Sequence, residues 1–227
     1  MSLLDKSRPR RALILGATGL TGRFCLQEIL ASEGYERVVS IGRRSSGVTH
    51  PKLTEITAEL SDLSDQADAF KCVDDIYCCL GTTIKKAGSQ EAFRQVDFEA
   101  PLQAAKMGID YGASQYFLIS SLGADEDSKL FYLRTKGEVE EHISRLPYQA
   151  VHLFRPPGIL GNRDETRTGE VIGNGLGKLL SPFLFGKLRK YRPMRAETIA
   201  KAMVAVSRES WKGIHFYDPI LIRKIAG

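Results

Sequence analysis

Three glycines placed directly after an apolar run constrain the fold of this chain more than any other feature. The run at residues 12–15 has the length and composition of a buried β-strand. Gly16, Gly19 and Gly22 follow it, and over residues 20–31 apolar side chains recur at the spacing of a helix. A strand, a glycine turn and a helix in succession are typical of a dinucleotide site, where the helix N-terminus faces the pyrophosphate. The alternative is a tight turn of an α/β domain that binds no ligand.

The composition is that of a globular α/β chain without a metal site. The chain has 227 residues, of which 43% are hydrophobic and 26% are charged, and its net charge of +5 is scattered along the sequence. This pattern gives no support to nucleic-acid binding, and no apolar span is long enough to predict a membrane-spanning helix. The cysteines and histidines lack the spacing of metal ligands, so we expect no metal, buried reduced thiols and a cytoplasmic location. The cysteines are Cys25, Cys72, Cys78 and Cys79.

Apolar segments separated by turns and helical patterns predict a Rossmann-like, doubly wound α/β fold. After the first strand, we expect strands at residues 37–42, 53–58, 74–80, 116–119, 150–155 and 213–217. Helices are expected between them, including one over residues 91–108 that Pro101 kinks. The prediction is a mainly parallel sheet of about seven strands with helices on both faces. Residues 1–227 then form one domain, with residues 160–195 as a substrate-covering or interface segment.

Two arginines follow the expected second strand, where a dinucleotide fold contacts the adenosine ribose. Arg43 comes 21 residues after Gly22, and Arg44 is next to it. An acidic residue at this place would bind the 2′-hydroxyl group of NAD, whereas a basic one accommodates the 2′-phosphate of NADP. A guanidinium group binds phosphate through two hydrogen bonds. The sequence therefore favours NADP(H), against the alternative of two solvated loop arginines.

Tyr132 and Lys136 have the spacing of two side chains on one face of a helix. A free tyrosine has a pKa of about 10, and a nearby ammonium group lowers such a pKa by favouring the phenolate. Tyr132 would then pass a proton to or from a carbonyl or alcohol oxygen. Ser120 and Ser121 stand at the end of the expected fifth strand, where a hydroxyl group would hold the same oxygen. The residues alone do not decide between the two serines, and we take Ser121.

Together these features resemble the atypical branch of the short-chain dehydrogenase/reductase superfamily, and within it the Tat-interacting-protein family of oxidoreductases. The resemblance rests on the glycine turn, the arginines after the second strand, the strand-end serines, and Tyr132 with Lys136. It also rests on short runs that follow the family order over most of the chain. These runs are residues 41–44, 78–83, 86–88, 120–125, 136–140 and 154–156.

The resemblance implies an NADPH-dependent oxidoreductase in which a hydride moves to a carbonyl-type substrate. Tyr132 would be the proton donor or acceptor, Lys136 would touch the nicotinamide ribose, and Ser121 would assist. The family contacts to the cofactor map onto two sets of residues. The first set is the glycine turn, with Gly16, Thr18, Gly19, Leu20, Thr21 and Gly22. The second set is Arg43, Arg44, Leu80, Gly81, Tyr132, Lys136 and Ile159.

The segment 160–195 leaves several readings open. Arg167 lies in a polar run that reaches a substrate or the cofactor, or is a solvated loop. Residues 176–191 are apolar with basic residues between, which is typical of a substrate lid, a contact between copies in a homo-oligomer or a membrane-surface patch. Pro182 and Gly186 interrupt a continuous amphipathic helix, so we favour the lid or the contact. An NADPH-binding sensor that acts through a protein partner is the alternative to an enzyme with a small-molecule substrate. An epimerase or dehydratase for nucleotide sugars would need a larger C-terminal part.

Overall fold

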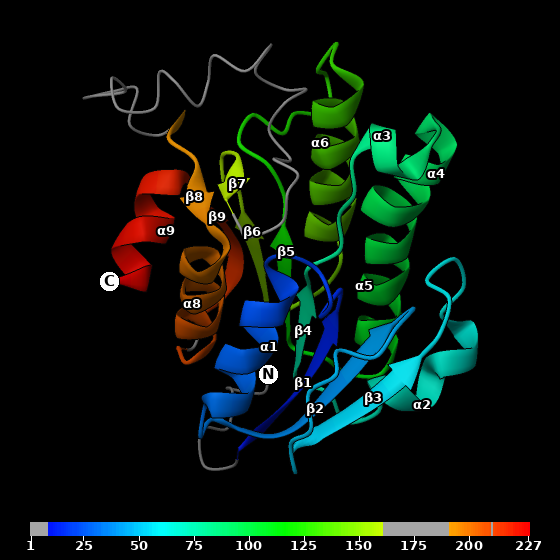
Figure 1. Cartoon of the computed structure of the whole chain (residues 1–227), viewed down its shortest axis with the longest axis vertical. Helices are drawn as coiled ribbons and strands as arrows, with labels where there is room; N and C mark the ends of the chain where they lie inside the picture. Colours follow the sequence, from blue (N-terminus) through cyan, green and yellow to red (C-terminus); the bar gives the residue numbers. More distant parts are fainter. Residues whose placement is uncertain (1–8, 161–190, 210) are drawn as a thin grey trace.

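The computed structural model describes residues 9–160, 191–209 and 211–227, and its centre is one parallel sheet (Figure 1). The strands of the sheet are β1 (Arg10–Leu15), β2 (Tyr35–Gly42), β3 (Leu53–Thr57), β4 (Asp75–Cys78), β5 (Gln115–Ile119), β6 (Ala150–Phe154) and β9 (Gly213–Tyr217). Their order is β3-β2-β1-β4-β5-β6-β9, and every neighbouring pair is parallel. The predicted Rossmann-like sheet of seven strands is confirmed.

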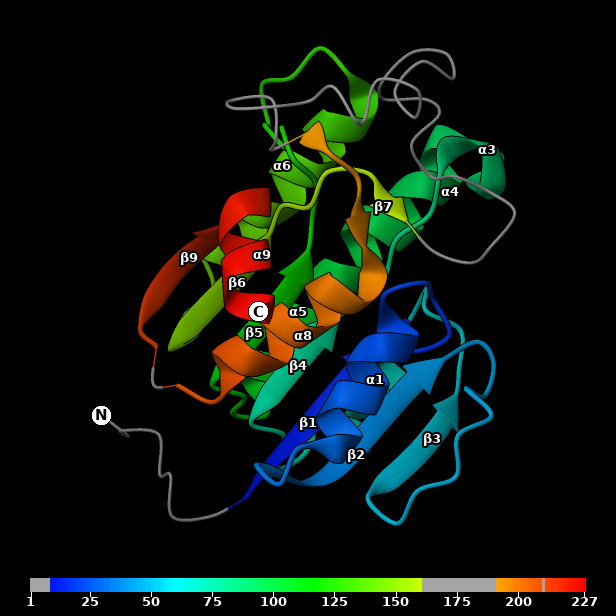
Figure 2. The same cartoon turned by 60° about the vertical axis from the view of Figure 1, so that its left-hand side comes forward.

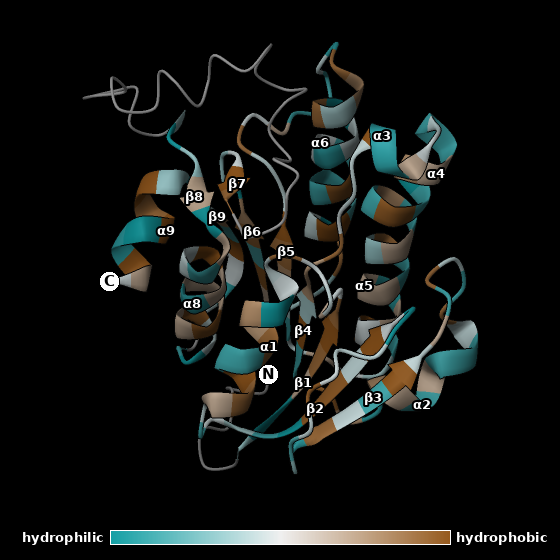
Figure 3. Ribbon diagram, in the orientation of Figure 1, coloured by the Kyte–Doolittle hydropathy of each residue, from teal (hydrophilic) through white to brown (hydrophobic). Residues whose placement is uncertain are grey.

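Helices cover both faces of this sheet (Figure 2). One face carries α1 (Gly22–Ala31), α8 (Ala196–Ser207) and α9 (Pro219–Ala226), and the other carries α2 (Ala67–Phe70), α5 (Ala100–Asp110) and α6 (Phe131–Ser144). Shorter connecting segments are η1 (Ser64–Gln66), α3 (Ile84–Ala87), α4 (Gln90–Arg94) and η2 (Gln95–Glu99). Apolar strands lie between helices whose outer sides are mostly hydrophilic (Figure 3).

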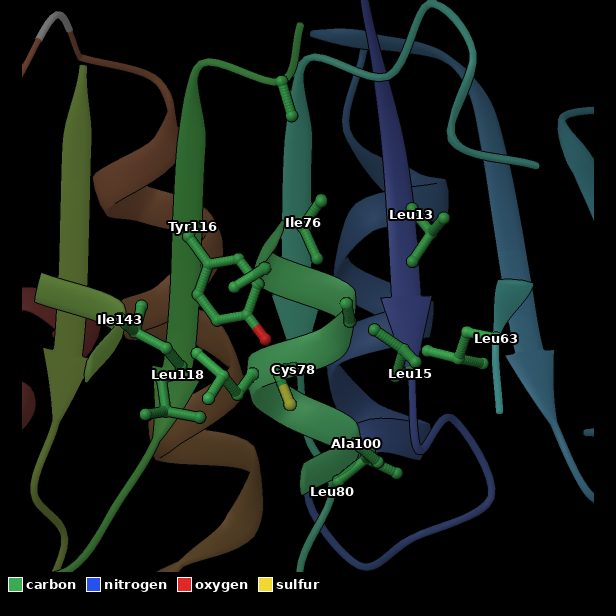
Figure 4. Close-up of a cluster of buried hydrophobic side chains, with 14 of the residues drawn as sticks. Leu13, Leu15, Leu63, Ile76, Cys78, Leu80, Ala100, Tyr116, Leu118 and Ile143 are labelled. Carbon is green, nitrogen blue, oxygen red and sulfur yellow. The ribbon is translucent and has the colours of Figure 1, made fainter. Parts of the chain in front are cut away.

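Strand β5 shows how alternation of side chains makes two cores. Tyr116 and Leu118 belong to the core on the α5 and α6 side, where Ile143 of α6 also lies (Figure 4). Phe117, between them in the chain, belongs to the core on the α1 and α8 side. Successive side chains of a strand point to opposite faces, which explains this division. The Tyr116 hydroxyl donates a hydrogen bond of 2.8 Å to the Pro101 carbonyl oxygen, so it ties β5 to the start of α5.

The single kinked helix expected over residues 91–108 is instead three segments, α4, η2 and α5. The middle one, η2, is a turn of π-helix, which is wider than an α-helix. Pro101 supplies the physical reason. In a continuous α-helix its ring would clash with the carbonyl group of Asp97, four residues earlier, and it has no N–H to donate there. Asp97 lies within the wide turn and is 1% exposed.

The order of the strands reverses at β1, because β2 and β3 extend the sheet on one side and β4 to β9 on the other. In doubly wound sheets, ligands bind outside the carboxyl ends of the strands at this switch point. A second, small ladder pairs β7 (Ile159–Leu160) with β8 (Met194–Arg195). Asp218 caps α9, since its carboxylate accepts hydrogen bonds from the N–H groups of Ile220 and Leu221.

Candidate functional site

The glycine turn between β1 and α1 is packed against itself and against the end of β4. Gly16 has a φ of +82°, and a Cβ there would lie 2.8 Å from the carbonyl carbon and oxygen of Cys79. A Cβ on Gly22 would lie 2.0 Å from the Gly16 oxygen, and one on Gly19 would lie 3.0 Å from the same oxygen. The Gly19 N–H group donates to that oxygen at 2.9 Å. Glycine is therefore required at these places by the turn itself.

The turn also holds a buried polar group that has no hydrogen-bond partner among the residues the structure describes. Thr21 is 4% exposed, and no described residue hydrogen-bonds to its Oγ1 atom. An unsatisfied buried hydroxyl group costs about 1–3 kcal/mol, so a ligand oxygen at this turn would be stabilising. In the first turn of α1 the Arg23 and Cys25 N–H groups donate to the Gly19 and Thr21 carbonyl oxygens, and the helix dipole favours an anion at this end. With Thr18 and Leu20 in the same turn, these residues fit the pyrophosphate of a dinucleotide.

Neighbouring strand ends bring the other expected cofactor residues to this edge. Arg43 and Arg44 follow β2, which pairs with β1, and both side chains are exposed. Leu80 and Gly81 follow β4, which pairs with β1 on the other side. The Cys79 N–H group donates to the Leu15 carbonyl oxygen at 2.9 Å, which keeps this segment beside the glycine turn.

Lys136 is buried within α6 and directed to the ends of β4 and β5. Its Nζ atom lies 2.8 Å from Asp97 Oδ1 and donates to the Ile119 carbonyl oxygen at 3.4 Å. Burial lowers the pKa of Lys136, but the charges of Asp97 and Tyr132 more than offset this, so its pKa lies above the usual range. Tyr132 lies one turn earlier in α6, is partly buried, and has its ring 5.8 Å from that of Phe93 in α4.

Asp97 is a site residue that the sequence analysis did not identify. One carboxylate oxygen pairs with Lys136, and the other accepts a hydrogen bond of 2.8 Å from the Thr82 N–H group. Asp97 therefore connects η2, the loop after β4 and α6. The signal in the sequence was its position, four residues after the apolar Phe93, which puts an acidic side chain on the buried side of a helix.

The two serines after β5 differ in their surroundings. Ser120 is 4% exposed, and no described residue hydrogen-bonds to its Oγ atom. Ser121 is partly exposed, and its hydroxyl group lies 3.4 Å from the Leu122 carbonyl oxygen. Leu118 packs on the α6 side of the sheet, so alternation places Ser120 on that side as well.

Of the remaining expected residues, Ile159 packs against the core that includes Ala17 and Cys79, and the others lie outside the described residues. Ile159 is in β7, partly exposed, and pairs with Met194. Arg167 and residues 176–190 of the predicted lid or subunit contact lie outside the described residues. Arg155, which follows β6, is a structural residue, because its guanidinium group pairs with the buried Glu140 of α6.

Comparison with known proteins identifies a family that binds NAD(P)H, the cofactor class expected from the sequence. A family model described as NAD(P)H-binding matches residues 16–176. Protein HTATIP2 of Rattus norvegicus is 38% identical over 168 residues, which are 73% of this chain and 69% of that protein. A protein of Emericella nidulans named fmp52, mitochondrial, is 31% identical over 210 residues, 88% of each chain.

The expected cytoplasmic location is wrong, because the fungal relatives are named as mitochondrial proteins. Cys25, Cys78 and Cys79 are buried free thiols as expected, but Cys72 is exposed, so the expectation was wrong for Cys72. Free thiols do not distinguish one intracellular compartment from another, which is why the cysteines misled the prediction of location. Among the described residues, no helix has the length and the apolar character that crossing a membrane requires.

Solved structures with low sequence identity share the fold. The UDP-N-acetylglucosamine 4-epimerase of Methanobrevibacter ruminantium M1 is 16% identical, with a TM-score of 0.68, and the match covers 93% of this chain and 77% of that one. A short chain dehydrogenase family protein of Francisella tularensis is 14% identical, with a TM-score of 0.65, and the match covers 94% and 99%. The chain therefore belongs to the NAD(P)H-binding family with a short-chain-dehydrogenase-like fold that includes HTATIP2 and the FMP52 proteins.

Proposed function

We propose that the protein is an NADPH-dependent oxidoreductase that reduces a carbonyl-type small molecule or oxidises the corresponding alcohol. The observation that carries this proposal is the buried Lys136 ammonium group, one helical turn from Tyr132 and beside the ends of β4 and β5. A buried ammonium group near a phenol, at the ligand-binding edge of a doubly wound sheet, suits proton transfer. Membership of an NAD(P)H-binding family supports a dinucleotide at the same edge.

The residues around the glycine turn would hold the cofactor. The N-terminus of α1 and the unsatisfied Thr21 hydroxyl group would bind the pyrophosphate. Arg43 and Arg44 are exposed at the end of β2, where a basic group accommodates the 2′-phosphate of NADP. Lys136 pairs with Asp97 and donates to the Ile119 carbonyl oxygen, and its ammonium group, which has three hydrogens, would also donate to a ribose hydroxyl group.

Side chains of the protein would supply the proton that the substrate oxygen takes up. When bound, the reduced nicotinamide supplies a hydride to the carbonyl carbon of the substrate. Tyr132 donates its hydroxyl proton to the carbonyl oxygen, which becomes the hydroxyl oxygen of the product alcohol. We take Ser120 instead of Ser121 as the donor to the same oxygen, because the buried Ser120 hydroxyl lies on the α6 side and has no partner among the described residues. The Lys136 charge stabilises the phenolate that remains on Tyr132.

Turnover by the purified protein tests this function. We expect at least one member of a panel of ketones, aldehydes and quinones to oxidise NADPH, followed as loss of NADPH absorbance. The Tyr132→Phe variant should keep its NADPH affinity and lose turnover by about a hundredfold or more, since general acid catalysis contributes about that much. Ser120→Ala should lower kcat, whereas Ser121→Ala should not.

Tyr111→Phe is the matched control, because this tyrosine is exposed at the end of α5. A Tyr132→Phe variant as active as the parent would refute the proposed mechanism. Binding of NADPH with no turnover across the panel would favour a cofactor-binding regulator that acts through a protein partner.

A further inference from the structure

Glu55, in the edge strand β3, holds the segment that follows β2. Both of its carboxylate oxygens accept hydrogen bonds from this segment, Oε2 from the Ser45 hydroxyl group at 2.5 Å and Oε1 from the Ser46 N–H group at 2.7 Å. Leu53, two residues earlier, packs against the core on the α1 side, so alternation places Glu55 on that side as well. Partial burial raises the pKa of Glu55, but the hydrogen bonds from Ser45 and Ser46 lower it by more, so its pKa lies below the usual range. The group is therefore a charged carboxylate near neutral pH.

Arg43 and Arg44 lie between two points at which the chain is attached to β3 or to its end. Before them, the Gly42 carbonyl oxygen accepts a hydrogen bond of 3.0 Å from the Ala58 N–H group, directly after β3. After them, the next two residues donate to the Glu55 carboxylate. A span of two residues has little conformational freedom when both of its ends are fixed. The direction in which the two arginines leave the chain is therefore set before any ligand binds.

The two serines also fold the rest of this loop. Ser45 Oγ accepts a hydrogen bond of 3.0 Å from the Gly47 N–H group, and Ser46 Oγ accepts one of 3.2 Å from the Val48 N–H group. Gly47 has a φ of +73°, and Val48 packs against the core on the α1 side. The single proton of the Ser45 hydroxyl group goes to Glu55, which leaves its oxygen free to accept from Gly47. Glu55 thus completes the hydrogen bonding of the loop that carries the arginines.

We propose that Glu55 is a positioning residue for the choice of cofactor: it holds Arg43 and Arg44 where they receive the 2′-phosphate of NADPH. This inference rests on the proposed function. On an unattached loop the arginines would become ordered only when the cofactor binds, and the entropy lost would weaken the affinity. NADH has no 2′-phosphate, so its affinity does not depend on this arrangement. A carboxylate that acted through its charge alone would instead repel the phosphate.

Titration of the full-length protein with NADPH and with NADH, followed by calorimetry or fluorescence, tests the inference. Glu55→Ala should weaken NADPH binding about tenfold and leave NADH binding unchanged. Ser45→Ala should weaken NADPH binding less, because the Ser46 N–H group still donates to Glu55. The double variant should bind NADPH as weakly as Glu55→Ala alone, since Ser45 acts through Glu55. Glu36→Ala is the matched control, because it removes the same charge from the neighbouring strand β2, near the end opposite to Arg43.

Three results of this titration would overturn the proposal. NADPH affinity that is unchanged in Glu55→Ala would show that the arginines do not need the carboxylate, and affinity that rises would show that it acts by charge. A loss of the same size for both cofactors would show that Glu55 supports the fold in general.

Cleavage by trypsin after Arg43 and Arg44 gives a measurement that needs no cofactor. We expect Glu55→Ala to be cleaved there faster than the parent and than Glu36→Ala, because its loop opens more often. Equal rates of cleavage would also overturn the proposal. If the parent bound NADPH no more tightly than NADH while Glu55→Ala was cleaved faster, the NADPH preference in the proposed function would be wrong, and Glu55 would still be the residue that holds the two arginines.

Discussion

At the scale of single residues, the glycines of the turn after β1 and the arginines after β2 have different roles. Gly16 and Gly22 are required because a Cβ at either place would meet backbone atoms at 2.8 Å or less. Their presence therefore explains the shape of the turn and does not choose between NAD and NADP. Side chains outside the turn determine which of the two cofactors binds. Arg43 and Arg44, which are exposed at the end of β2, have the charge that suits the 2′-phosphate of NADP.

Replacing Arg43 and Arg44 with alanine should weaken NADPH binding and leave NADH binding unchanged. A charge-assisted hydrogen bond contributes about 1.5–3 kcal/mol, so the loss in NADPH affinity should be roughly ten- to a hundredfold. Calorimetric or fluorescence titration with both cofactors measures this. Arg37→Ala is the control, because Arg37 is exposed on the same strand, toward its opposite end. Equal loss of affinity for both cofactors would contradict the assignment of the 2′-phosphate to these arginines.

At the scale of elements, the strands and the glycine turn could be predicted because their signals are local. Apolar runs, glycine spacing and the interval from Tyr132 to Lys136 are properties of short stretches of chain. The local signal for Asp97, its position four residues after Phe93, places it on a buried side but does not reveal its role, which depends on a π-helical turn and on a partner in another helix. The two serines after β5 could not be separated either, since the sequence does not say which face of the sheet α6 covers.

In helix α6, helix propensity and packing predict opposite changes in stability for one substitution. Gly137→Ala would gain about 1 kcal/mol of stability from helix propensity alone. However, a Cβ there would lie 2.2 Å from the backbone of Asp125 and Glu126, in the loop between β5 and α6. We expect the cost of overpacking to exceed the gain in helix propensity. Chemical denaturation should then show a free energy of unfolding that is lower by about 1–3 kcal/mol. Ser144→Ala, in the last turn of α6, reports the propensity effect by itself. A more stable Gly137→Ala protein would show that this loop moves freely.

At the scale of the whole molecule, aromatic rings connect four neighbouring strands across one face of the sheet. Tyr77, Phe117, His152 and His215 occupy matching positions on β4, β5, β6 and β9. Successive ring centroids lie 4.5, 4.5 and 5.4 Å apart. His152, within this row, is fully buried, and its Nδ1 atom lies 2.9 Å from the Tyr217 hydroxyl oxygen. The row ties the strands together and makes the stability of the sheet depend on pH.

Burial, followed by the charges of His215 and Arg10, lowers the pKa of His152 from 6.5 to about 3. The unfolded chain therefore binds a proton at a pH where the folded ring stays neutral, and this contribution to stability is lost as pH falls below 6.5. Asp75 acts in the opposite direction, because burial raises its pKa from 3.8 to about 7. Its folded form keeps a proton that the unfolded form releases, so its contribution is lost as pH rises toward 7.

Comparing the parent with His152→Gln isolates the histidine, since Asp75 is present in both proteins. Each pH unit below the ordinary pKa of histidine changes the free energy of unfolding by about 1.4 kcal/mol per proton. Between about pH 7 and about pH 5, the parent should therefore lose about 2 kcal/mol relative to the variant. Chemical denaturation at several pH values gives this difference, and any fixed packing cost of the glutamine cancels from it. A difference that stays constant with pH would mean that His152 titrates in the folded protein as it does in the unfolded chain.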